Sequence, residues 1–331
     1  MAFFQGFYPK FLRNWVFYVT VFVFVVLIVL WIGNPFDVAD TFFGKVQKTP
    51  AEILSYIGIV CGAILLLGNQ YTTNRRNLIM EKGNLDIRFK DAALLLANEA
   101  TSATISGIYA LHQVAVEASR GDKNEQGYVK TIHDILCAFV RENWRKTSDD
   151  TTVGNKPKIV LQTLMDVLFK NEKDIYKEYY SDLSNCVFQD INLENATLTN
   201  VGFNDTKLTN VWFSDAILTF VGFNNAKLTE VWFPNAKLTA VGYSDAKLTD
   251  VGFSNAKLTE VWFNNAKSID VGFRDAKLTN VRFRHAKLAN VDFFKATLAN
   301  VDFFDTILKD YTYEEITSKG FSLEKTKAKD E

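Results

Sequence analysis

Residues 241–260 read VGYSDAKLTDVGFSNAKLTE, and this stretch holds the pattern that decides the fold of the second half of the chain. From about Leu183 to Leu308 the sequence repeats every ten residues, and each ten consists of two fives. A five has a small residue, a variable residue, a large apolar residue and two mostly polar ones, with Phe and Leu alternating in the large position. Residues two apart on an extended chain point their side chains the same way, so each five-residue unit turns two side chains inward. No unit can bury its pair alone, and the units must therefore stack as a solenoid.

This spacing resembles that of the pentapeptide-repeat family, whose members form a right-handed, four-sided β-helix with one five-residue unit on each side. The resemblance implies that twenty residues make one coil and that residues twenty apart form a ladder. One unit departs from the pattern, because Ser268 stands where a leucine belongs. We interpret it as a local defect of the core, with its hydroxyl bonded to a neighbouring backbone group.

The whole chain is predicted to contain a right-handed quadrilateral β-helix preceded by a small all-α domain and a two-helix transmembrane hairpin. The predicted boundaries are 1–70 for the membrane anchor, 71–180 for the helical domain, 181–310 for the β-helix and 311–331 for a C-terminal cap or tail. A length of 331 residues with 48% apolar content allows two or three domains and excludes disorder as the main state. The net charge of −1 indicates no partner.

Two apolar segments suggest a membrane protein. Residues 15–32 are 18 residues without a charge, bounded by Trp15 and Trp31, which suits a transmembrane helix with interfacial tryptophans. Residues 53–68 are shorter and are interpreted as the return span. Within them, Gly58 and Gly62 form a small-xxx-small pair for helix packing, against the first span or a second subunit of a homo-oligomer.

Basic residues precede the first span and follow the second, which favours both termini and the repeat rod in the cytoplasm. These residues are Lys10, Arg13, Arg75, Arg76 and Lys82. With the family resemblance, they predict the bacterial inner (plasma) membrane as the location and the lipid bilayer as one partner.

Apolar residues at spacings of three and four predict helices within 89–100, 105–119, 129–143 and 159–171. Two of these segments, 105–115 and 135–143, resemble the helical region between anchor and repeats in bacterial pentapeptide-repeat membrane proteins. That region is similar to an armadillo-type helical repeat, so the domain is expected to be armadillo-like.

The sequence offers no recognisable catalytic, cofactor or metal motif. His112 and His133 lie on amphipathic helices and are expected to be half-buried or surface imidazoles, and His285 occupies an outward slot of the repeat. The three cysteines show no paired spacing. We therefore expect no enzyme activity, no cofactor and no metal.

The outward positions of the rod carry two patterns. Lysines twenty apart should form two columns, which either hold phosphates or anionic headgroups or are solvated faces interleaved with carboxylates. The columns are Lys207, Lys227, Lys247, Lys267 and Lys287 on one side and Lys237, Lys257 and Lys277 on the other.

Exposed aromatic residues form the second pattern. Trp212 and Trp232 are twenty apart and should stack, with Ile217 and Phe220 on or near the adjoining side, as a candidate protein interface. Glycines in the equivalent slots, such as Gly252, should leave a flat surface that another backbone can approach. The outward aromatic residues of the last coils suggest either a cap formed by the tail or end-to-end dimerisation.

These features favour a membrane-anchored scaffold that presents the rod to an unidentified protein partner. The alternative is a nucleic-acid-related role, because some proteins of the resembled family mimic duplex DNA and modulate topoisomerases. Mimicry requires a strongly acidic surface, which the lysine columns oppose, so a nucleic-acid partner is not expected. A third hypothesis is an enzyme or sensor that uses the helical region.

Overall fold

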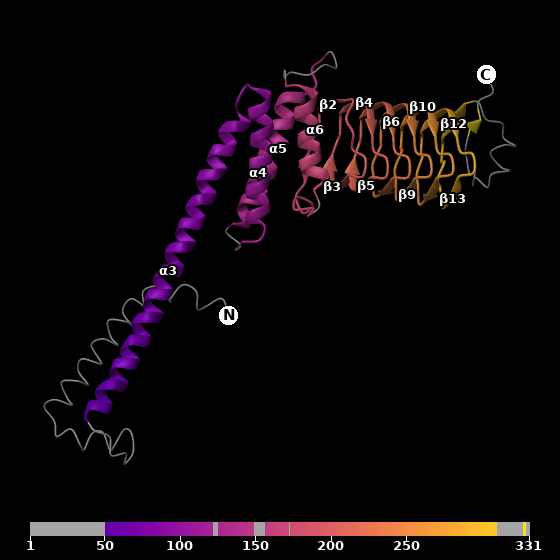
Figure 1. Cartoon of the computed structure of the whole chain (residues 1–331). Coiled ribbons are helices and arrows are strands. Elements are labelled where there is room, and N and C mark those ends of the chain that lie inside the picture. Colours follow the sequence, from indigo (N-terminus) through magenta and orange to yellow (C-terminus); the bar gives the residue numbers. More distant parts are fainter. Residues whose placement is uncertain (1–49, 122–124, 149–155, 172, 310–326, 329–331) are drawn as a thin grey trace. The chain divides into compact units, whose positions relative to one another are not determined.

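The computed structural model describes residues 50–121, 125–148, 156–171, 173–309 and 327–328 (Figure 1). The chain divides into two compact units, Met1–Asn84 and Leu85–Glu331. The expected first span, 15–32, and most of the expected cap, 311–331, lie outside the described residues.

The first described helix, α3, runs without interruption from Pro50 to Leu96. It therefore includes both residues 53–68 and the segment 89–96, which we expected in separate helices. The intervening sequence, residues 69–88, contains no proline, and its one glycine, Gly83, costs only about 1 kcal/mol in a helix. Within the part of the chain that the structure describes, none of the helices combines the length and apolar character needed to span a bilayer.

Three further helices form a packed layer, and they confirm the predicted helical segments. They are α4 (Thr101–Ala118), α5 (Gln126–Trp144) and α6 (Lys158–Phe169), and each packs against the other two. At Gly107 a Cβ atom would lie 2.3 Å from the backbone nitrogen of Leu96. Glycine is therefore required where α4 meets the end of α3.

Short parallel strands build the rest of the second unit and form two sheets. The seven-stranded sheet contains β1 (Ser181–Asp182), β3 (Thr197–Gly202), β5 (Ile217–Gly222), β7 (Lys237–Thr239), β9 (Lys257–Thr259), β11 (Lys277–Thr279) and β13 (Thr297–Ala299). The eight-stranded sheet contains β2 (Val187–Gln189), β4 (Lys207–Trp212), β6 (Lys227–Trp232), β8 (Lys247–Gly252), β10 (Lys267–Gly272), β12 (Lys287–Asp292), β14 (Ile307–Lys309) and β15 (Lys327–Ala328).

The register confirms the predicted ladder of residues twenty apart. Leu208 pairs with Leu228, and Leu228 with Leu248, so one coil has twenty residues. The same offset joins the end of the chain to the last coil, because Ile307 pairs with Lys327. Residues 327–328 thus add one rung to the eight-stranded sheet.

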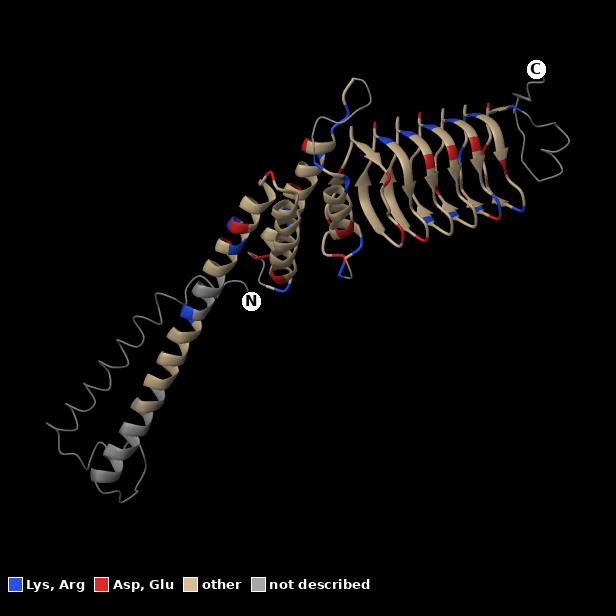
Figure 2. Ribbon diagram, turned by 45° about the horizontal axis from the view of Figure 1, so that its top comes forward, with Lys and Arg blue, Asp and Glu red and all other residues tan. Residues whose placement is uncertain are grey.

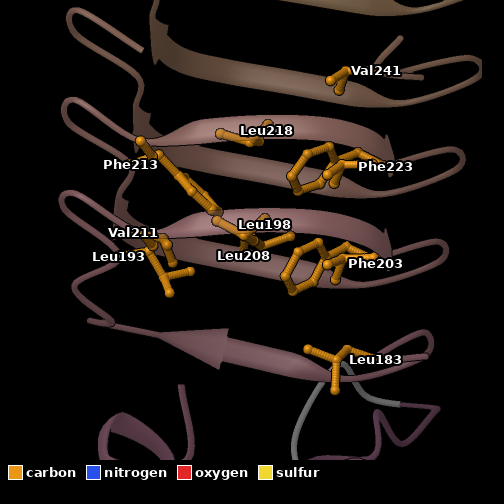
Figure 3. Close-up of a cluster of buried hydrophobic side chains, with 14 of the residues drawn as sticks. Leu183, Leu193, Leu198, Phe203, Leu208, Val211, Phe213, Leu218, Phe223 and Val241 are labelled. Carbon is orange, nitrogen blue, oxygen red and sulfur yellow. The ribbon is translucent and has the colours of Figure 1, made fainter. Parts of the chain in front are cut away.

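The interior of the β-solenoid holds two columns of stacked aromatic rings together with leucine, valine and alanine side chains, and Figure 3 shows Phe203 and Phe223 in successive coils beside buried leucines. Phe203 and Phe223 stack with ring centroids 5.1 Å apart, and Phe213 and Phe233 stack at 4.7 Å. Rings of the two columns meet edge to face, as Phe213 does with Phe223. Each aromatic pair contributes about 0.5–1.5 kcal/mol beyond area burial, so the columns stabilise the stack along its whole length.

Every fifth residue from Asn185 to Asp305 adopts a left-handed backbone, with φ between 50° and 60°. These residues turn the chain at four corners in each twenty-residue coil. Most are Asn or Asp, the non-glycine residues that enter this region at least cost. The fifth position of the repeat is therefore selected by backbone geometry.

Candidate functional site

Trp212 and Trp232 lie side by side on neighbouring strands of the eight-stranded sheet. Their positions are paired in register, and their ring centroids are 6.0 Å apart with planes inclined by 32°. Trp212 is 45% exposed, and Trp232 is partly exposed. The indole nitrogen of Trp212 donates a hydrogen bond to Oδ1 of Asn210, 3.3 Å away, which orients this ring toward the Asn210 corner.

The expected flat glycine surface is largely absent, because most of the glycines are covered by side chains. A Cβ at Gly252 would lie 2.7 Å from the Trp232 ring, and one at Gly202 would lie 2.1 Å from the Tyr180 hydroxyl oxygen. Only Gly272, among the glycines of these slots, has nothing within 4 Å of its added Cβ. Glycine at 252 thus serves the packing of Trp232 and leaves no room there for another backbone.

Ile217 and Phe220 belong to β5 in the seven-stranded sheet, whereas Trp212 and Trp232 belong to the eight-stranded sheet. Ile217 is 41% exposed and occupies the ladder position followed by Lys237 and Lys257. Phe220 is 62% exposed and sits at a left-handed corner with φ of 55°. A bulky residue in this conformation is an outlier that costs about 1–2 kcal/mol, and such strain is typical of functional positions.

Trp262 is a third outward tryptophan, which the sequence reasoning did not include. It bridges Gly242 and Arg282 in the ladder of the other sheet and is partly exposed. The signal was available, because Trp262 occupies the same place in its unit as Trp232. Trp262 follows Trp232 by thirty residues, which is one and a half coils, so the two tryptophans lie on opposite sides of the β-solenoid.

The lysine columns form as predicted, and rows of opposite charge run beside them (Figure 2). Lys207, Lys227, Lys247, Lys267 and Lys287 are equivalent in register across five strands. The corner row beyond them contains Glu230, Asp250 and Asp270, all exposed. This arrangement fits the solvated face with interleaved carboxylates.

The final coils carry two similar corner clusters. Arg274 lies over the ring of Phe294 at 5.1 Å and pairs with Asp292 at 3.4 Å. Ten residues later, Arg284 lies over Phe304 at 6.0 Å and pairs with Asp302. The outward phenylalanines at this end are thus partly covered by the arginines of the preceding coil.

The helical layer is joined to the first coil by a chain of polar contacts centred on His133. Its Nε2 lies 2.9 Å from the Ser181 hydroxyl oxygen and its Nδ1 lies 3.2 Å from Oδ1 of Asp134. Both His133 and Ser181 are buried, and burial lowers the pKa of His133 below its ordinary value despite the opposing effect of Asp134. His133 is therefore a buried connector, whereas the sequence suggested a partly exposed ring.

This chain of contacts has the connectivity of a serine nucleophile with its base, but its chemistry differs. Ser181 is 2% exposed, so its hydroxyl offers no access to a substrate. Cys137, 3.6 Å from His133, is also buried, and burial raises the pKa of its thiol to about 12. The cluster holds α5 against β1 and gives no reactive group to solvent.

More contacts across the same junction reinforce it. Arg141 donates to the backbone oxygen and to Oδ2 of Asp182, each at 2.9 Å, and Lys146 donates to the Asp205 carbonyl at 2.8 Å. The helical layer and the β-solenoid therefore share one continuous interface within the second unit.

Of the two glycines of the predicted anchor, only Gly62 has surroundings that the structure describes. Gly62 lies in α3 with nothing within 4 Å of an added Cβ, so it makes no close helix contact among the described residues. Gly58 also lies in α3, but its surroundings are outside the described part of the structure.

Comparison with known families agrees with this geometry. A family described as "Pentapeptide repeat region" matches residues 246–323, and one described as "Pentapeptide repeats (8 copies)" matches residues 180–215. The chain is a pentapeptide-repeat protein, with a β-solenoid preceded by a helical domain. No curated protein matches the chain.

Solved structures of pentapeptide-repeat proteins are similar to part of the chain. HetL from the cyanobacterium Nostoc sp. strain PCC 7120, described as involved in heterocyst differentiation regulation, is 20% identical over 39% of this chain and 62% of its own, with a TM-score of 0.17. QnrB1, a plasmid-mediated fluoroquinolone resistance protein, is 13% identical over 46% of this chain and 78% of its own, with a TM-score of 0.24. Rfr23 from the cyanobacterium Cyanothece 51142 is 20% identical over 37% and 86%, with a TM-score of 0.16.

Proposed function

We propose that this protein is a membrane-anchored interaction scaffold, in which a right-handed, four-sided β-helix presents an aromatic surface to a protein partner in the cytoplasm. The observation that carries the proposal is the Trp212–Trp232 pair on a rigid strand surface, in which Trp212 is exposed and Trp232 is partly exposed. Tryptophans are enriched among residues that dominate binding energy, and rigid strands hold them in place without an ordering cost.

The strained corner at Phe220 supports a binding role on the adjoining side. An Asn at this position would be free of the steric cost, as at Asn200 and Asn210. Phe220 keeps 62% of its surface exposed in this strained conformation. A contact made with a partner is a sufficient reason for it.

The anchoring part of the proposal rests on α3 and on the uncharged stretch before it. Leu65, Leu66 and Leu67 are 66–71% exposed, although consecutive residues of a helix point about 100° apart. A helix that is apolar on several faces must be covered by protein or by lipid. Residues 15–32 supply a second apolar segment of spanning length, and the basic residues outside the two segments favour cytoplasmic termini.

The proposed role is binding without catalysis, and the helical layer serves as a spacer. Its polar cluster is buried and connects α5 to the first coil, which suits a rigid support. The alternative of DNA mimicry and topoisomerase modulation is disfavoured by the lysine columns, since a mimic needs an acidic surface.

A crosslinking pull-down from native membranes tests the proposal. Trp212→Ser combined with Trp232→Ser removes one exposed and one partly exposed ring from the outer surface, so the fold should remain and partner recovery should be lost. The matched control is Tyr109→Ser, which removes an exposed ring from the helical layer. Unchanged recovery with the double variant would refute the role of the tryptophan surface, and recovery of the wild type from the soluble fraction alone would refute the anchor.

A further inference from the structure

Three aromatic side chains from three segments meet at the junction between the helical layer and the first coil. Tyr176, in the segment between α6 and β1, contacts His112 of α4 and His133 of α5, with 5.8 Å between the ring centroids of each pair. Its hydroxyl oxygen lies 3.2 Å from Nδ1 of His112. Tyr176 and His133 are buried, and His112 is partly buried. We call these three residues the histidine joint.

Each histidine of the joint contacts a hydroxyl group that suits a neutral ring. Burial raises the pKa of Tyr176, so its phenol keeps the proton and can donate a hydrogen bond to Nδ1 of His112. The buried hydroxyl of Ser181 can donate in the same way to Nε2 of His133, 2.9 Å away. A protonated imidazole has only donors, so it would leave both hydroxyls without these acceptors. A buried hydroxyl without an acceptor weakens the packing around it.

The surroundings of both rings disfavour a positive charge. Burial lowers the pKa of His112 and of His133, and a nearby lysine lowers each of them further. Asp134 opposes this effect at His133, but its carboxylate is half exposed and also pairs with Lys130 at 2.5 Å. A second proton is also repelled by the first, because both rings contact the same tyrosine. The titratable and charged groups around the joint are Lys130, Asp134, Cys137 and Arg141 on α5, Lys173, Asp174, Lys177 and Tyr179 after α6, and Asp182 on β1.

We propose that the histidine joint is an acid-sensitive contact, which holds the helical layer against the first coil at neutral pH and loosens it on the α5 side in mild acid. Protonation weakens the contact of His133 with Ser181 and the contact of His112 with Tyr176 together. Residues 173–184, which contain Tyr176 and lead into the first coil, are the segment that loosens.

A small cavity gives solvent access to the joint. Its volume is about 10 Å³, and Tyr176 and Ser181 both line it. A space of this size admits about one water molecule. Protons can therefore reach the two hydroxyl groups, and through them the histidines, before the junction opens.

The α6 side of the junction has a contact that does not titrate. The side-chain amide of Gln162 donates to the carbonyl oxygen of Asn192 at 2.8 Å and accepts from the Asn192 backbone N–H at 2.9 Å. Histidine is the side chain that ordinarily changes its charge between pH 5 and 8, so this amide pair persists when the joint takes up protons. The junction should therefore open as a hinge that stays closed at α6.

Acid favours the loosened joint, because both histidines have a lower pKa in the closed joint than the ordinary value of about 6.5. Below that pH the loosened state binds more protons than the closed state. Its population rises by up to about tenfold per histidine for each pH unit, until the rings of the closed joint are protonated as well. Above pH 7 the population should not depend on pH.

Hydrogen exchange of the full-length protein in a non-ionic detergent tests the inference, with labelling times corrected for the effect of pH on the intrinsic exchange rate. Between pH 7.5 and pH 5.5 we expect exchange to become about tenfold faster in residues 173–184. Residues 191–193, beside the Gln162 pair, and residues 221–283 of the β-solenoid should change less than twofold. An unchanged rate in 173–184, or an equal acceleration in 221–283, would overturn the proposal.

Variants identify the histidines as the source of the effect. His112→Asn with His133→Gln keeps a neutral hydrogen-bonding group in place of each ring and should abolish the acceleration in 173–184. The third histidine of the chain, His285, lies in one of the last coils, and His285→Gln should leave the acceleration unchanged. An acceleration that survives in the double variant would refute the role of the two histidines.

The pH at which exchange begins to accelerate is a second criterion, and it needs no variant. We expect the onset near pH 6.5, where histidines of the loosened joint take up protons. An onset below about pH 5, where carboxylates take up protons, would contradict the proposal.

Discussion

Tyr243 carries a hydroxyl group in the middle of the aromatic columns, and replacing it with phenylalanine should stabilise the protein. Its side chain is fully buried, and its ring stacks between Phe223 at 5.0 Å and Phe263 at 4.9 Å. The hydroxyl oxygen has no hydrogen-bond partner among the described residues, and burial raises the pKa of the phenol well above its usual value. An unpaired buried hydroxyl costs about 1–3 kcal/mol, which Tyr243→Phe should recover.

The assay is urea denaturation followed by circular dichroism, with thermal unfolding in parallel. For a unit of this size 1 kcal/mol moves the midpoint by about 2–4 °C, so Tyr243→Phe should raise it by roughly 2–12 °C. The matched control is Phe263→Tyr, one coil further along the same column, which introduces the same hydroxyl and should lower the midpoint by a similar amount. If Tyr243→Phe lowers stability, the hydroxyl has a favourable partner and the reasoning is wrong.

Three further predictions concern the core, a corner and the junction. Ser268→Leu restores the regular ladder at a buried position and should stabilise the protein by about 1–2 kcal/mol in the same urea assay; a loss of stability would show that the core has closed around the serine. Phe220→Asn should add about 1 kcal/mol by relieving its left-handed backbone, yet weaken partner recovery; lower stability would contradict the assigned strain. Burial lowers the pKa of both His112 and His133, so the unfolded chain takes up protons more readily, and stability should be full above pH 6.5 and fall as the pH drops below it. His133→Gln should flatten this slope in pH-dependent denaturation, and an unchanged slope would exclude the buried ring as its source.

The β-solenoid could be predicted from the sequence because two separate periods determine it. One period determines which side chains point inward, and the other determines the length of a coil. The alternation within each five selects the buried pair, as in Val211 and Phe213, and the repetition over twenty residues selects the ladder, as in Lys207 and Lys227. Neither inference needs knowledge of distant contacts, because each coil meets only its neighbours.

The features that could not be predicted depend on how individual side chains are placed, and the period of the sequence carries no information about that. Gly252 looked like an open slot because the pattern does not show that the Trp232 ring leans over it. His133 looked half-exposed because its partner Ser181 lies on a strand 48 residues later. The strain at Phe220 was visible in principle, since Asn and Asp prevail at the same corner of other units.

Photo-crosslinking in the native cell tests the central claim, that the tryptophan surface is where a protein partner binds. A photoreactive phenylalanine analogue is placed at Trp212, and for comparison at Tyr109, which is also exposed but lies on α4. The account predicts a discrete adduct from position 212 in the membrane fraction and none of the same mass from position 109. No adduct at position 212, or the same adduct from both positions, would contradict it.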